Sequence, residues 1–292
     1  MKNKKLTALL LAATMMTGVL AGCGGGNNDD NADGELKTVS KGKLTVSISP
    51  DFAPTVFVDP SKEGQDRYVG TDVTLCRFIA DELGLELVLS PMSFEACQVA
   101  VSTGQVDFSV NGYAPTDKRA ENYLFSDQYR MNESDEGQTV ICLASKADQF
   151  KDLANTTGLK GGVQNSSLQE NLMREQLPNI EIVYFSDLNT GIMQLRNGDF
   201  DVMGVDGTNA KAMITANPDL ATTGFYYDYD GEGVVALMQK GNDAMAEAIN
   251  EILPKAKEHF AEWLAEANEL ADIGVEEILD DQGNVVTPEP AE

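Results

Sequence analysis

The chain has 292 residues, and its 47 aspartates and glutamates outnumber its 21 lysines and arginines, which gives a formal net charge of −26 at pH 7. Because so negative a protein is repelled by nucleic-acid phosphates and by anionic headgroups, the composition excludes nucleic acid as a partner and electrostatic binding to lipid. One histidine, four cysteines and no Cys-x-x-Cys motif predict neither a metal site nor a disulfide framework, and nothing points to a cofactor.

The N-terminus has the order of a secretory signal. Three lysines within the first five residues precede an apolar run at 6–20 that is too short to span a membrane. The Leu-Ala-Gly-Cys that ends at Cys23 resembles the lipobox of bacterial lipoproteins. The resemblance implies that residues 1–22 are removed and that fatty acids such as palmitate on Cys23 anchor the protein outside the cell membrane. An ordinary secretory signal with an incidental cysteine is the alternative.

Both ends of the processed chain are expected to lack a fold of their own. Residues 23–43, rich in glycine, asparagine and aspartate, predict a flexible tether. Residues 270–292 hold seven acids and neither lysine nor arginine, which predicts an acidic, disordered tail, with one helical turn at 275–279 as an option.

Between these ends, strands alternate with helices. The apolar spacing of the first half predicts strands at 44–49, 85–89 and 106–110, and helices that begin at Thr71 and Ser93. The second half predicts a strand ending at Gln164, strands at 180–185 and 201–205, and helices that begin at Ser167 and Asp187. The βαβαβ order indicates an α/β sheet that is at least partly parallel.

One short pattern occurs twice. Residues 103–108 and 197–202 share one pattern. In each, a helix ends at a glycine, an aspartate follows three residues after that glycine, and an apolar strand begins next. Together with the repeated order of elements, this echo predicts two similar α/β lobes, whose sheets would present their carboxyl ends to a shared cleft.

The first lobe offers groups that suit a carboxylate. The segment from Gly112 to Arg119 follows a strand and opens a short helix with Thr116 as its expected cap. Backbone N–H groups and a guanidinium are both donors to a carboxylate. The alternative for Arg119 is a solvated helix residue that pairs with Glu121 or Asp117.

The second lobe offers a turn and an acid. Residues 164–167 form another strand-to-helix turn with N–H donors. Asp206 ends a strand, where its carboxylate can pair with an ammonium group or cap the helix expected at 208–216, and the two roles are compatible.

These motifs resemble, in order and spacing, those of the extracytoplasmic solute-binding proteins of polar amino acid ABC transporters (bacterial solute-binding protein family 3). The resemblance runs from about Leu44 to Leu264. The matching segments are Pro-Asp-Phe-Ala-Pro at 50–54, Val-Gly-Thr-Asp-Val at 69–73, Pro-Thr-Asp-Lys-Arg at 115–119, Phe-Ser-Asp-Gln-Tyr at 125–129, Gly-Val-Gln-Asn-Ser-Ser at 162–167, Val-Asp at 205–206, Gly-Val-Val-Ala at 233–236, and Trp263.

The resemblance implies an α/β, two-lobed periplasmic-binding-protein-like (type II) fold, in which each lobe is a mixed sheet flanked by helices. The expected first lobe is 44–138 plus 233–269, and the second is 139–232. Two hinge strands, near 139–143 and 231–237, would join them and allow closure.

The same resemblance implies the ligand contacts. Arg119 and the Ala114 N–H would hold the α-carboxylate, with the Ser167 N–H and the Gln164 turn completing the site from the second lobe. Asp206 and the Gly112 carbonyl would take the α-ammonium. The rings of Phe52, Phe94 and Tyr113 would form aromatic walls.

Three departures from the family pattern bear on the ligand. Ser49 stands three residues before Phe52, where members that bind cationic side chains often carry aspartate. Ala114 replaces a frequent serine or threonine, and Ser166 a frequent glycine. The side-chain subsite therefore reads as apolar and aromatic, which favours a neutral ligand and keeps arginine open, because a guanidinium can also stack on rings.

The resemblance implies a monomeric receptor without catalytic residues, which delivers an amino acid to the membrane permease of an ABC importer at the extracytoplasmic face of the membrane. One alternative is a dehydratase-like enzyme acting on a small carboxylic acid, with Glu95 as the only acid to name in the cleft. Another is a sensor or adhesin module.

Cys76, Cys97 and Cys142 read as core residues, with a Cys76–Cys97 bridge as the alternative.

Overall fold

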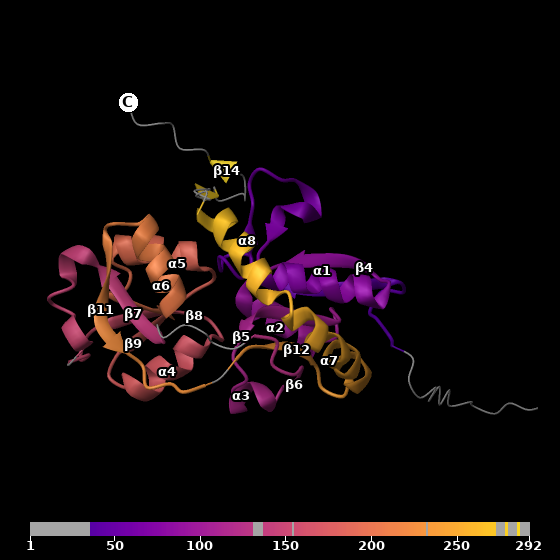
Figure 1. The fold of residues 1–292 in the computed structure, drawn as a ribbon. Coiled ribbons are helices and arrows are strands. Elements are labelled where there is room, and N and C mark those ends of the chain that lie inside the picture. The colour runs from indigo at the N-terminus through magenta and orange to yellow at the C-terminus, as the bar shows by residue number, and fades with distance from the viewer. Residues whose placement is uncertain are drawn as a thin grey trace, which may run out of the picture. The chain divides into compact units, whose positions relative to one another are not determined.

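The computed structural model (Figure 1) describes residues 36–130, 137–153, 155–231 and 233–272, and the pairs 278–279 and 285–286. The signal segment and Cys23 lie outside the described residues, as does most of the expected tail. In the part of the chain that is described, no helix is long and apolar enough to cross a membrane.

The first of two five-stranded sheets is mixed, with the strand order β4-β1-β5-β12-β6. Its strands are β1 (Lys43–Ile48), β4 (Glu86–Pro91), β5 (Phe108–Tyr113), β6 (Tyr123–Phe125) and β12 (Val235–Gln239). β1 runs parallel to β4 and β5, whereas β12 is antiparallel to β5 and β6. The predicted, partly parallel βαβαβ sheet is therefore confirmed.

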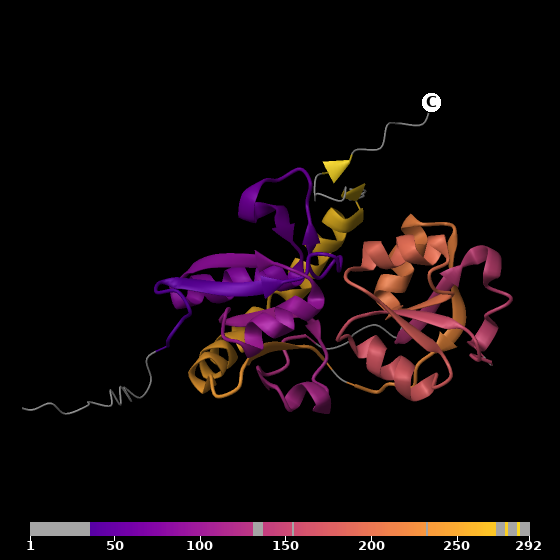
Figure 2. The ribbon, with the colours of Figure 1, turned by 180° about the vertical axis from the view of Figure 1, so that it is seen from behind.

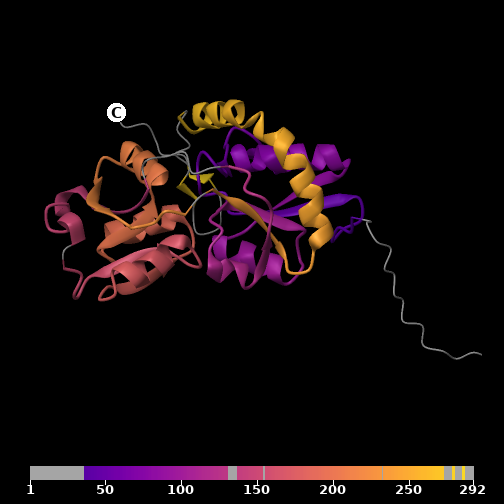
Figure 3. The same cartoon turned by 60° about the horizontal axis from the view of Figure 1, so that its bottom comes forward.

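Helices cover both faces of this sheet. Leu75, Ile79 and Ile249 pack with Val46 of β1 in one apolar core, whereas Val101 packs with residues of β5 and β12 in another. The helices of this first lobe are α1 (Thr71–Leu83), α2 (Phe94–Ser102), α3 (Asp117–Ala120), α7 (Asp243–Lys257) and α8 (Phe260–Asp272). In Figure 3, α7 and α8, in gold, follow one another along the side of the first lobe that carries α1. A two-stranded ribbon of β2 (Phe57–Val58) and β3 (Tyr68–Val69) precedes α1.

The second sheet repeats the plan, with the order β11-β7-β10-β8-β9. Its strands are β7 (Gln138–Leu143), β8 (Lys160–Gln164), β9 (Glu181–Phe185), β10 (Val202–Asp206) and β11 (Leu220–Tyr226). In this second lobe α4 (Leu168–Gln176) packs on one face, and α5 (Leu188–Asn197) and α6 (Gly207–Ala216) on the other. Figures 1 and 2 show the two lobes from opposite sides.

The predicted caps form as the sequence indicated. The side chains of Ser93, Ser167 and Asp187 each accept a backbone N–H in the first turn of their helix. Gly84 and Gly198 end α1 and α5 in the left-handed conformation that lacks a steric cost only for glycine.

The repeated sequence pattern is a repeated structural device. Before β5, Asp107 accepts the Thr45 N–H of the neighbouring parallel strand at 2.7 Å. Before β10, Asp201 accepts the Lys160 N–H of its own parallel neighbour at 3.0 Å. Both aspartates thus supply an acceptor to a strand end, and the two-lobed α/β fold is confirmed at this level.

Three local expectations need correction. The strand expected at 106–110 is displaced to 108–113, since the backbone around Asp107 turns to present that side chain to β1. The tether is shorter than expected, because Leu36 packs against the first core and the Val39 N–H donates to Asp107 at 2.7 Å. At the far end, Ile278–Leu279 pairs with Val285–Val286 as short strands, so those two residues do not continue a helical turn.

The strands expected as hinges, near 139–143 and 231–237, overlap the sheet strands β7 and β12. β7 and β12 are interior strands of the second and first sheets. Arg130 and Val234 form an isolated antiparallel bridge, and the Tyr227 N–H donates to the Gln138 carbonyl at 2.9 Å. The described ends of the two connections therefore lie side by side, where Arg130 pairs with Val234 and Tyr227 with Gln138.

Candidate ligand-binding site

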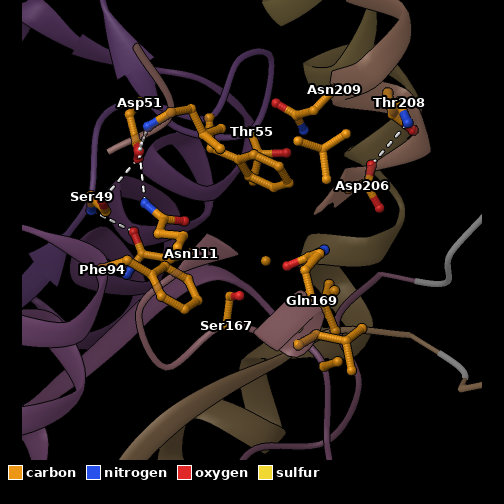
Figure 4. A pocket seen from close by; sticks show the side chains of 18 of the residues that line it. Ser49, Asp51, Thr55, Phe94, Asn111, Ser167, Gln169, Asp206, Thr208 and Asn209 are labelled. Atoms are coloured by element: carbon orange, nitrogen blue, oxygen red, sulfur yellow. Dashed lines mark hydrogen bonds between the residues drawn. The ribbon is translucent and has the colours of Figure 1, made fainter. Parts of the chain in front are cut away.

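A pocket of about 340 Å³ lies between the two lobes, a size that suits a small metabolite. Strand ends supply much of it, as expected for open α/β sheets. It is lined by Ser49, Asp51, Phe52, Pro54, Thr55, Phe94, Asn111, Gly112, Ala114, Arg119, Arg130, Gln138, Gln164, Ser167, Leu168, Gln169, Leu188, Gly204, Val205, Asp206, Thr208, Asn209, Val234, Leu264 and Asn268. In Figure 4, Ser49, Asp51 and Phe94 stand on one side, and Gln169, Asp206 and Asn209 on the other.

Two of the three predicted rings line the pocket. Phe52 follows β1 and packs so closely on Gly112 that a Cβ there would lie 2.9 Å from the ring, while the φ of +63° also favours glycine. Phe94 begins α2. Tyr113 lies behind Phe94, with ring centroids 5.1 Å apart, and is fully buried. Its hydroxyl accepts from Asn111 at 2.8 Å, so the structure places this ring in the core beneath the wall, away from the pocket surface.

Arg119 is a buried cation. Its side chain donates to the carbonyl of Ala114 at 3.0 Å and, across the pocket, to the carbonyl of Ser166 at 3.2 Å. The guanidinium carbon lies 5.2 Å from the Tyr113 ring and 5.8 Å from the Phe94 ring. Burial lowers the pKa of Arg119 from its ordinary value.

No carboxylate of the described residues forms an ion pair with Arg119. The alternative interpretation, a solvated helix residue paired with Glu121 or Asp117, is therefore wrong. A desolvated guanidinium that retains unused donors is costly by itself, and an anion entering the pocket would offset that cost.

Asp206 ends β10 in the second lobe and lines the same pocket as Arg119. One carboxylate oxygen accepts the Thr208 N–H at 2.9 Å and so caps α6. The other accepts from the amide of Gln138 at 2.8 Å, and the oxygen of Gln138 accepts in turn from Gln169. The cap is confirmed, and the carboxylate also lines the pocket, so both predicted roles are sterically compatible.

The turn at 164–167 lines the pocket, but its groups are engaged. The Ser167 N–H donates to the Gln164 carbonyl at 3.2 Å, and the Ser167 hydroxyl caps α4. The amide of Gln164 donates to Asp51 at 2.9 Å. Ser166 adopts a φ of +62°, which is uncommon outside glycine.

Several lining residues were not predicted. Asn111 is a buried polar residue inside β5, whose oxygen accepts the Ser49 N–H, and a polar residue among apolar strand positions was its available signal. Gln138 faces Asp206 only through the antiparallel register of β7 and β10, which local sequence does not specify. Arg130 lies near the buried Asp72. Burial raises the pKa of Asp72, and the positive charge of Arg130 offsets part of that rise.

Asp51 lies in the Pro-Asp-Phe-Ala-Pro segment at 50–54, and the family resemblance implied no role for it. Its carboxylate lines the pocket and accepts from Ser49, Gln164 and the Leu188 N–H. Burial raises the pKa of Asp51 from 3.8 to about 6. Glu95, the acid named for the enzymatic alternative, is exposed and lies outside the pocket lining.

The three cysteines of the described residues lie in the interior of the protein. Cys76, Cys97 and Cys142 are free and buried, so the Cys76–Cys97 bridge is not formed. The part of the chain that is described contains no cluster of histidine, cysteine or acidic side chains able to hold a metal ion.

Comparisons with known proteins show which proteins this chain is similar to. Residues 44–263 match the family model described as bacterial extracellular solute-binding proteins, family 3. The arginine-binding extracellular protein ArtP of Bacillus subtilis is 28% identical over 217 residues, covering 73% of this chain and 77% of that protein. A cyclohexadienyl dehydratase of Pseudomonas aeruginosa is 26% identical, covering 63% of this chain and 66% of the enzyme.

A solved structure shows the same fold. It is the amino acid ABC transporter substrate-binding protein AbpA of Streptococcus pneumoniae, bound to L-arginine. It is similar with a TM-score of 0.70 and 29% identity, covering 79% of this chain and 96% of that one. With the family model spanning both lobes and the pocket between them, the chain belongs to the bacterial extracellular solute-binding proteins, family 3.

Proposed function

We propose that this protein is a lipid-anchored receptor, which binds a small α-amino acid between its lobes and delivers it to an ABC importer. The observation that carries the proposal is Arg119, a buried cation without a carboxylate partner among the described residues, on a pocket that also exposes Asp206. The first suits an α-carboxylate and the second an α-ammonium, and they belong to different lobes. A zwitterion that touches both therefore favours the closed arrangement.

The walls restrict the side chain of the ligand. Phe52 and Phe94 offer flat apolar surfaces, which suit aromatic and aliphatic groups and also a guanidinium. ArtP is named for arginine and AbpA was solved with it, so L-arginine is the first ligand to test. Neutral aromatic amino acids are the next candidates, because Ser49 stands where cation-binding members often carry aspartate.

A thermal-shift screen of the twenty amino acids tests the proposal. A ligand that binds only the folded state at 100 times its Kd raises stability by about 2.7 kcal/mol, which is several degrees for a protein of this size. We expect such a shift for arginine or a neutral aromatic amino acid. If none of the twenty shifts the melting temperature, the proposal of an amino acid receptor is wrong.

The acid named for the enzymatic alternative does not line the pocket. Although a dehydratase is among the relatives, Glu95 is exposed and does not line the site. The proposal therefore assigns no catalytic residue. It places the monomeric receptor at the extracytoplasmic face of the cell membrane, with the permease as its partner.

Changing Cys23 to serine tests the lipid anchor. A serine cannot form the thioether that carries the lipid, so we expect the variant to remain unprocessed or to leave the membrane fraction. Membrane fractionation and mass spectrometry of the N-terminus provide the measurement. The control is Cys142→Ser, the same substitution at a buried cysteine, which should leave the anchor in place. Wild-type protein recovered without detergent, with an unmodified N-terminus, would contradict the anchor.

A further inference from the structure

One acidic side chain connects the lobes directly. Asp51 follows β1 of the first lobe, yet one of its oxygens accepts two hydrogen bonds from the second lobe. The amide of Gln164, at the end of β8, donates at 2.9 Å, and the N–H of Leu188, the first residue of α5, donates at 2.9 Å. The Ser49 hydroxyl holds the other oxygen at 2.8 Å from within the first lobe.

The same turn of the second lobe is held at a second point. The carbonyl of Ser166 accepts from Gln98 at 3.3 Å and from Arg119 at 3.2 Å, both in the first lobe. These bonds form with Ser166 at a φ of +62°, a conformation that needs support from its surroundings. Two residues apart, Gln164 and Ser166 thus bind separate groups of the first lobe.

We propose that Asp51 is a positioning residue for closure: its carboxylate binds the Gln164 strand end and the α5 N-terminus, and so holds the lobes together without a ligand. The inference deepens the proposed function, since a receptor whose lobes already favour contact spends less of its ligand's binding energy on closing. Separation of the lobes would break both bonds at once, because donors and acceptor lie on opposite sides of the pocket.

Protonation of Asp51 should be linked to closure. Asp187, which caps α5, faces Asp51, and its charge raises the Asp51 pKa further. The neutral donors around Asp51 are Ser49, Gln164 and the Leu188 N–H. The Cys97 thiol on α2 is also near, since the charge of Asp51 raises its pKa. A pKa of about 6 in the closed arrangement, against 3.8 for a solvated carboxyl, means that the closed form binds the proton more tightly. The ratio of closed to open molecules should therefore rise about tenfold from pH 7 to pH 5, and fall again as the pH rises through 6.

Single-molecule energy transfer on the ligand-free full chain tests the proposal. Dyes on Val99→Cys in α2 and Met193→Cys in α5 report the separation of the lobes, because both native side chains are at least half exposed. At pH 5, where Asp51 is protonated in the closed form, Asp51→Ala should lower the ratio of closed to open molecules about tenfold, the effect of losing two neutral hydrogen bonds. The matched control is Asp66→Asn, which changes an 81% exposed acid of the same lobe and should alter the ratio less than about twofold.

Asp51→Asn separates the acceptor from the charge. Its amide oxygen can still accept from Leu188 and Gln164 and it has no charge to desolvate, so at pH 7 this variant should close at least as well as the wild type, and the pH dependence of closure should disappear. A ratio in Asp51→Ala equal to that of the control, or a wild-type ratio that does not change between pH 7 and pH 5, would overturn the proposal. No amino acid is added in this experiment, so its outcome does not depend on the ligand screen. A failed screen would disprove the amino acid receptor and leave the role of Asp51 in closure standing, and a failed closure experiment would leave the receptor standing.

Discussion

Replacing Arg119 with alanine is expected to weaken binding of the ligand by about 30- to 5000-fold, because loss of one partner of a desolvated charge pair typically costs on the order of 2–5 kcal/mol. Arg119 is 6% exposed, and its guanidinium donates to the carbonyls of Ala114 and Ser166 and lies over the rings of Phe94 and Tyr113. An α-carboxylate would be its first negative partner. Isothermal calorimetry with the amino acid found by screening measures the loss.

The fold should tolerate this change. A buried cation without a counter-ion adds little net stability, so the ligand-free melting temperature of Arg119→Ala should stay within about 5 °C of wild type. Arg119→Lys is the matched control, since it keeps the charge and loses the planar fork that binds a carboxylate through two bonds. We expect an intermediate affinity for it. Wild-type affinity in Arg119→Ala would show that the carboxylate binds elsewhere.

Asp206→Asn should weaken binding by at least about 30-fold while leaving the fold intact. Asparagine caps helices as well as aspartate does, so its oxygen can still accept the Thr208 N–H. What the variant loses is the negative charge opposite Arg119. Calorimetry measures the affinity, and urea unfolding measures the free energy of unfolding, which should change by less than about 1 kcal/mol.

Asp206→Ala separates the two roles of this residue. It loses the cap as well as the charge, and should lower the free energy of unfolding by about 0.5–2 kcal/mol in addition to weakening binding. If Asp206→Asn binds the ligand as wild type does, Asp206 serves only as a cap and as the acceptor for Gln138.

Local signals in the sequence predicted the framework well. Caps and helix-ending glycines such as Ser167, Asp187 and Gly198 depend on residues only three or four apart, so spacing alone places them. The repeated Gly-x-x-Asp pattern correctly indicated two similar lobes, since Asp107 and Asp201 act alike.

Long-range contacts set the limits of that prediction. Tyr113 reads as a wall because it follows a strand, but its hydroxyl joins Ser109 and Asn111 and draws the ring into the core. Asp51 meets Gln164 and Leu188 across more than 110 positions of sequence, a contact that no local pattern specifies. Arg119 likewise donates to the Ser166 carbonyl of the other lobe, 47 positions away in the sequence.

The central claim, that a zwitterion bridges Arg119 and Asp206, is tested most directly with ligand analogues in one calorimetric series. The amino acid found by screening is compared with its decarboxylated amine and with the analogue that lacks the α-amino group. The account predicts that each analogue binds at least about 30-fold more weakly to the wild type, and that Arg119→Ala no longer distinguishes the amine from the amino acid. An amine that binds the wild type as tightly as the intact amino acid would contradict it.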